Sequence, residues 1–188
     1  MATLKHTIVA LVEDRPGVLN RVASLFRRRN FNIESLAVGH TDVPGLSRMT
    51  IVVDGSTTVV EQVTKQLRKL VEAVKVSDIA EDEVVARELA LIKVRTTPAT
   101  RSEVIQIVDI FHADIVDVSL DTVTVEVTGD EAKIDALVQL LKNFGIKEMA
   151  RTGRVALTRG ASGTSTDEEQ PVPMRRVVPP NRRIVASQ

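Results

Sequence analysis

One order of hydrophobic patterns occurs twice along this chain of 188 residues, and this repeat constrains the fold more than any other feature. In each copy, apolar runs typical of β-strands and apolar stripes of helical period follow the order strand, helix, strand, strand, helix, strand. This order is that of the ferredoxin-like split βαβ arrangement. We therefore predict an α+β fold of two tandem ferredoxin-like βαββαβ modules.

The first copy is assigned to residues 1–80. A helix is expected after Pro16, because apolar residues there follow a helical stripe. The residues of this stripe are Val18, Val22, Leu25 and Phe26. A second helix is expected where Thr58 and Glu61 have capping-box spacing, ahead of apolar residues at steps of three and four up to Val74. Strands are expected at residues 5–12, 33–39, 49–53 and 74–79.

The second copy is assigned to residues 81–159, and the charged stretch at 78–88 is predicted to link the two. Thr100 and Glu103 again have capping-box spacing before a helical stripe, and Asp130 opens the second helix. Strands are expected at 89–94, 115–118 and 122–127, with a closing strand within 145–157. Residues 160–188 are polar and lack apolar periodicity, which predicts a disordered tail.

Composition excludes several classes of function. The chain has no cysteine, so disulfides, thiolate nucleophiles and cysteine-bound zinc are excluded. Its 25 basic and 25 acidic residues balance, and it lacks Trp and Tyr, so nucleic acid is not an expected partner. No apolar stretch has the length of a membrane span and no signal-peptide core is present, so we expect a cytoplasmic protein without a membrane partner.

The segment from Asp14 to Leu19 is the first candidate for a binding site, because it joins the first strand to the first helix. The first amides of a helix lack intrahelical acceptors and can bind a carboxylate or a phosphate. Gly17 lets a ligand approach the backbone, and Pro16 rigidifies the turn. The alternative is structural: Asp14 caps the helix and Gly17 relieves backbone strain.

The start of the second strand adds a second group of candidates. Asn32 carries two donors and an acceptor, which match the carboxylate and ammonium groups of a zwitterion. Ile33, together with Val18 and Leu19, is suited to an aliphatic slot. These residue types favour a small branched amino acid as the ligand.

Three stretches carry a resemblance to a known family. They are Glu-Asp-Arg-Pro-Gly-Val-Leu-Asn-Arg-Val at 13–22, Asn-Phe-Asn-Ile-Glu-Ser-Leu at 30–36 and Leu-Ser-Arg-Met-Thr-Ile at 46–51. The chain resembles the small subunit of acetohydroxyacid synthase, also called acetolactate synthase, and the resemblance covers both modules. It implies that the first module is an ACT domain, a regulatory domain that binds valine.

The resemblance also implies where valine binds: two ACT domains pair side by side as a homodimer, and valine lies at their shared interface. The implied contacts are the side chains of Asp14 and Asn32 and the backbone of Gly17, Val18, Leu19 and Ile33. Many relatives have asparagine in place of Asp14. An anionic group there favours the ammonium of the ligand and disfavours its carboxylate.

The resemblance further implies a regulatory protein without catalytic residues. Such a subunit activates a large catalytic subunit and confers valine feedback inhibition in branched-chain amino acid biosynthesis. Thiamine diphosphate, FAD and Mg²⁺ are expected in that large subunit, where pyruvate condensation takes place. An alternative is a free-standing ACT regulator of transcription, although no helix-turn-helix is recognisable outside residues 5–159. The three histidines, His6, His40 and His112, are scattered singly, so no metal site is expected.

Overall fold

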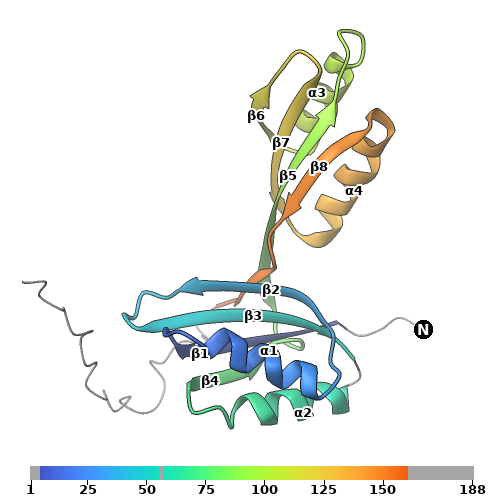
Figure 1. Ribbon diagram of the computed structural model, residues 1–188. Coiled ribbons are helices and arrows are strands. Elements are labelled where there is room, and N and C mark those ends of the chain that lie inside the picture. Colours follow the sequence, from blue (N-terminus) through green and yellow to red (C-terminus); the bar gives the residue numbers. More distant parts are fainter. Residues whose placement is uncertain (1–4, 56, 161–188) are drawn as a thin grey trace, which may run out of the picture.

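The computed structural model describes residues 5–55 and 57–160, which form two modules that stand at an angle to one another (Figure 1). The second module rises from one face of the first module's sheet, and strands β5, β8 and the segment after β8 connect the two (Figure 1). Apart from Gly160, the predicted tail at 160–188 lies outside the described residues. No helix within the described ranges is long and apolar enough to cross a bilayer.

The first module has the predicted order of elements. They are β1 (Lys5–Glu13), α1 (Val18–Arg28), β2 (Ile33–His40), β3 (Leu46–Asp54), α2 (Thr57–Leu67) and β4 (Ala73–Asp78). The strands pair antiparallel in the order β2-β3-β1-β4, and both helices lie on one face of this sheet (Figure 1). The second helix ends at Leu67, so the predicted continuation to Val74 is wrong, because Val74 belongs to β4.

The core of the first module lies between the sheet and its helices. Alternate residues of β1 point to this core, as the two-residue period of a strand requires. They pack against the buried stripe of α1, which consists of Val18, Val22, Leu25 and Phe26 as predicted. Burying one such side chain contributes about 1.5–3 kcal/mol to stability. This stripe therefore fixes α1, and with it the loop that precedes the helix, against the sheet.

The second module repeats the topology. Its elements are β5 (Val84–Arg95), α3 (Arg101–Ile110), β6 (Asp114–Val118), β7 (Thr122–Gly129), α4 (Glu131–Leu141), the 3-10 helix η1 (Lys142–Phe144) and β8 (Ile146–Arg151). The strand order β6-β7-β5-β8 matches that of the first sheet, and Ile92 and Val125 of the sheet are fully buried together with Leu137 of α4. The fold class predicted from the repeat is thus confirmed.

The connection between the modules differs from the prediction. Residues 84–88 are not a linker but the first part of β5, and residues 84–87 pair with β9 (Val155–Thr158). The predicted closing strand is therefore two strands, β8 and β9. The physical reason is a short alternating pattern: Val84 and Ala86 pack on Val9, on the face of the first sheet that lacks helices.

The predicted helix caps are borne out at one position and wrong at another. The Asp130 carboxylate accepts a hydrogen bond of 2.8 Å from the Lys133 amide and so caps α4. Thr100 precedes α3, but among the described residues its hydroxyl makes no capping bond and instead accepts from the Thr97 amide at 2.9 Å. The side chain of Thr58 lies outside the described residues.

Candidate functional site

The loop between β1 and α1 presents an open helix N-terminus. Gly17 precedes α1 with φ of 90°, a left-handed conformation that only glycine adopts without strain. Apart from Gly17 and its two chain neighbours, no described residue has an atom within 4 Å of the position that a Cβ would take at Gly17, so the backbone conformation, rather than lack of space, requires glycine. No described side chain caps the helix, so its first amides lack a side-chain acceptor, although the Val18 amide donates to the Arg15 carbonyl at 3.4 Å.

Asp14 does not cap this helix, so the structural alternative for Asp14 is wrong. Its amide donates to the Gly45 carbonyl at 2.8 Å, which ties the loop to the β2–β3 turn. Its carboxylate lies 3.1 Å from Nδ1 of His40, and both side chains are exposed. Sequence reasoning did not connect His40 with this loop, because its imidazole reaches Asp14 only through the pairing of β2 with β3 and of β3 with β1.

A buried carboxylate holds the base of the same loop. Glu72 is 5% exposed and accepts a hydrogen bond of 2.5 Å from Nη1 of Arg21 on α1. Its backbone carbonyl accepts from the Glu13 amide at 2.9 Å, directly before the loop. Arg15 pairs with Glu13 at 2.6 Å. The loop is therefore fixed at both ends, and no sequence motif identified Glu72.

The side chains predicted to line an aliphatic slot have different environments. Val18 is 4% exposed and belongs to the core, so its side chain is not available to a ligand, and its amide donates to the Arg15 carbonyl at 3.4 Å. Leu19 is 46% exposed and lies beside the open helix end. Ile33 is half-buried and packs on the edge of the core.

Within one chain, the predicted site residues form two groups at opposite ends of the first sheet. Glu13, which directly precedes the loop, pairs with Leu46 at the start of β3, whereas Ile33 pairs with Val53 near its end. The distance along β3 between these two positions is about 23 Å at the usual rise of a strand. A single chain therefore brings Asp14, Gly17, Val18 and Leu19 together but keeps Asn32 and Ile33 away from them.

The two groups are connected by an exposed edge. In the described part of the chain, β2 has a neighbour, β3, on one side only. Its outer edge thus carries a row of backbone N–H and C=O groups that a further strand can pair with. One end of this edge is Asn32 and Ile33, and the other is His40 beside Asp14. Within the described ranges, no three His, Asp or Glu side chains are grouped as metal ligands.

Comparisons with known proteins agree on one family. The family described as the small subunit of acetolactate synthase matches residues 87–160, and the AHAS small subunit-like ACT domain matches residues 8–75. The probable acetolactate synthase small subunit of Archaeoglobus fulgidus is 59% identical over 84% of this chain and 98% of its own length. The acetolactate synthase small subunit of Mycobacterium leprae is 55% identical over 86% of this chain and 95% of its own length.

A solved structure supports the same assignment. The small subunit of acetolactate synthase from Thermotoga maritima superposes with a TM-score of 0.78 at 44% identity, and the match covers 84% of this chain and 99% of that one. The similarity therefore includes both modules and their arrangement. This chain belongs to the acetolactate synthase small subunit family, a regulatory family built on the ACT domain.

Proposed function

We propose that two copies of this chain pair along β2 and bind a branched-chain amino acid, valine in the first instance, at each end of the shared strand pair. The observation that carries this proposal is the division of the predicted site between the two ends of one exposed edge strand. A two-fold axis through the middle of β2 makes the two β2 strands antiparallel. The Asn32 end of one copy then lies at the His40 end of the other, beside Asp14 and Gly17.

The chemistry of the two groups suits the two charged ends of an amino acid. The first amides of α1 and the positive end of its dipole favour the ligand's carboxylate. The carboxylate of Asp14 favours its ammonium group, and Asn32 of the second copy can bond to either end. Leu19 of one copy and Ile33 of the other supply the apolar surface for a branched side chain.

We further propose that the paired chains bind a catalytic large subunit of acetolactate synthase, raise its activity and make it sensitive to valine. The names of the relatives support a partner of this kind, since a small subunit implies a large one. Thiamine diphosphate, FAD and Mg²⁺ are assigned to that partner. Coupling between a regulatory ligand and a distant site typically amounts to about 1–3 kcal/mol, so valine must bind the inhibited arrangement better by that amount.

Replacement of Asn32 by alanine tests this function. Loss of hydrogen bonds to a charged ligand costs about 1.5–3 kcal/mol, which weakens valine inhibition by about 10- to 100-fold. We expect the Asn32→Ala chain to activate the large subunit as well as the wild type in a reconstituted assay. Asn143→Ala, at an exposed position of the second module, is the matched control. Unchanged valine sensitivity in Asn32→Ala would show that the pocket is assigned wrongly.

A further inference from the structure

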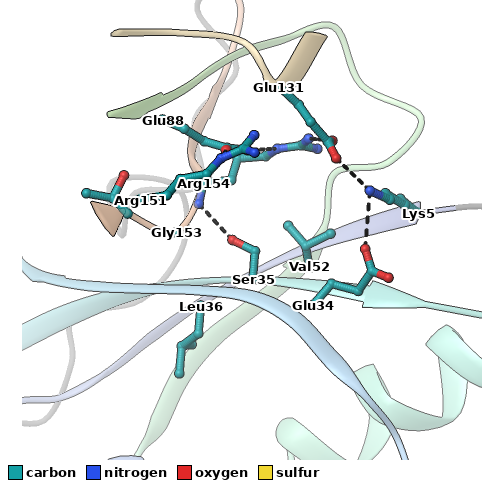
Figure 2. A pocket seen from close by; sticks show the side chains of 11 residues that line it. Lys5, Glu34, Ser35, Leu36, Val52, Glu88, Glu131, Arg151, Gly153 and Arg154 are labelled. Carbon is teal, nitrogen blue, oxygen red and sulfur yellow. Dashed lines mark hydrogen bonds and ion pairs between the residues drawn. The ribbon is translucent and has the colours of Figure 1, made fainter. Parts of the chain in front are cut away.

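The contact between the two modules lies directly beside the residues assigned to the ligand. Six residues, which we call the inter-module junction, make this contact: Lys5, Glu34, Ser35, Glu131, Gly153 and Arg154. Glu34 and Ser35 follow Asn32 and Ile33 on β2, whereas Glu131 opens α4 of the second module. Figure 2 shows these side chains converging between β2 and the second module.

Lys5 is the first connection of the junction. Its Nζ lies 2.7 Å from Oε1 of Glu131 and 3.2 Å from Oε2 of Glu34, so one ammonium joins α4 to β2 (Figure 2). The hydrogen bond from Lys5 lowers the pKa of Glu131 and so favours the ionised form of this carboxyl. A displacement of Glu34 therefore acts on Glu131 through a single shared cation.

Arg154 is the second connection. Its backbone amide donates to Oγ of Ser35 at 2.8 Å, and its guanidinium donates to Oε2 of Glu131 at 2.6 Å (Figure 2). The same guanidinium also bonds to Glu88, whose side chain is 8% exposed and accepts from Arg151 at 2.6 Å as well. Arg154 thus links β2, β5 and α4, and each cation of the junction has a carboxylate partner.

Gly153 allows a close approach of the two backbones. A Cβ at this position would overlap the carbonyl of Leu36 and approach the amide of Ala37. Any larger residue would therefore push the segment after β8 away from β2. The two backbones are therefore in close contact where Leu36 meets Gly153.

The junction differs from the other attachment between the modules. The base of the β5–β9 pair is held by apolar contacts, in which Ala156 and Ile79 pack on Val9, and by a hydrogen bond of 2.8 Å from Arg48 to the Ala156 carbonyl. The junction is polar, and it borders a cavity of about 440 Å³. Partly exposed ion pairs separate at low cost, whereas a packed apolar contact does not. The base can therefore act as a pivot while the junction opens and closes.

We propose that the inter-module junction transmits valine binding from the first module to the second. A ligand held by Asn32 and Ile33 shifts the next residues of β2, and Glu34 and Ser35 pass this shift to Glu131 and Arg154. The second module then changes its angle about the apolar base. This inference rests on the proposed function, because it takes valine as the ligand and inhibition of a large subunit as the outcome.

The test uses the full chain in the double variant Ser35→Ala/Glu131→Gln and, separately, in Lys5→Met. Glu61→Gln, which removes an exposed ion pair on α2, is the matched control. Valine binding to the isolated chain is measured by titration calorimetry, and activation and inhibition are measured with a reconstituted large subunit. We expect valine affinity of the isolated chain within about two-fold of the wild type, normal activation, and maximal inhibition reduced by at least half.

Two results would overturn the junction's role: wild-type maximal inhibition in both variants, or loss of activation together with inhibition in both. Failure of the proposed function would look different. In that case the wild-type chain itself would neither bind valine in the calorimeter nor make the reconstituted enzyme sensitive to it. The junction's role and the proposed function are therefore refuted by different observations.

Discussion

The two modules share a topology but differ in the loop between the first strand and the first helix, which we call the corner. In the first module, the amide of Asp14 donates to Gly45 at 2.8 Å, and in the second, the amide of Thr96 donates to Asp121 at 2.9 Å in the equivalent place. After this common bond, the first module continues through Gly17 to an uncapped helix within the described chain. The second module instead closes its corner with its own side chains.

In the second module, hydrogen bonds between side chains and backbone groups hold the corner in place. The hydroxyl of Thr97 accepts a hydrogen bond of 3.2 Å from the amide of Thr100. The hydroxyl of Thr100 accepts one of 2.9 Å from the amide of Thr97. The guanidinium of Arg101 donates to the carbonyls of Ser119 and Leu120. The loop before α3 is thus held by its own side chains, whereas the start of neither helix is capped by a described side chain. The comparison teaches that two copies of one fold can differ in the loop before the first helix, where Gly17 adds no side chain and where Thr97 and Thr100 bond to each other's amides.

The largest expected effect comes from filling the open corner. Gly17→Val places a β-branched side chain at a left-handed φ and blocks the α1 amides, so valine affinity should fall by about 100-fold or more. Thr100→Val, the matched change in the closed corner, should leave valine affinity unchanged. Calorimetry measures both, with unfolding temperature as the check on folding. Equal losses in the two variants would refute the distinction between the corners.

A smaller effect is expected from Asp14→Asn. The exposed carboxylate is proposed to attract the ligand's ammonium group, and an exposed charge interaction contributes at most about 1 kcal/mol. Valine affinity should therefore fall by about two- to five-fold, because the amide of asparagine still offers an acceptor. Titration of the variant with valine measures the change. A gain in affinity would mean that Asp14 repels the ligand's carboxylate instead.

The smallest expected effect is that of pH, which should act on the ionic inter-module junction and not on the apolar base. Bonding to Lys5 lowers the pKa of Glu131, so its stabilisation is present above the ordinary carboxyl value and lost as pH falls through the lowered one. Bonding to Glu131 and Glu34 raises the pKa of Lys5, so its stabilisation is lost only as pH rises through the raised value. Both contributions are present from about pH 5 to about pH 9.

The junction should therefore loosen below about pH 4, while the apolar base stays in contact. Small-angle scattering should show a modest increase in the largest dimension of the particle at that pH. Glu131→Gln should already show the larger dimension at neutral pH and change less on acidification. A pH-independent dimension in the wild type would contradict an ionic junction.

Local patterns predicted most of the fold, because the periods of strands and helices depend on residues that are close in sequence. The stripe of α1 and the Asp130 cap are of this kind. The first part of β5 was missed because its alternation at Val84 and Ala86 is short and lies among charged residues, and its partner β9 is distant in sequence. Burial against Val9 decides that this segment is a strand, and no local pattern contains that information.

The candidate site was less accessible to sequence reasoning. The residue types at Asp14, Gly17 and Asn32 indicated the chemistry, but their positions depend on strand order and register. Those are set by contacts between distant segments. Only the register shows that Asn32 lies at the far end of the sheet from Gly17, and only the β2–β3 pairing shows that His40 meets Asp14.

The most direct test of a site shared between two chains is complementation. Asn32→Ala and Gly17→Val chains, carrying different tags, are co-expressed, and the mixed dimer is purified through both tags. Each variant alone should bind valine at least about 10-fold more weakly than the wild type at both of its sites. The mixed dimer should regain one valine per two chains, because one of its sites combines an intact Gly17 with an intact Asn32. A mixed dimer that binds no valine would contradict the shared site.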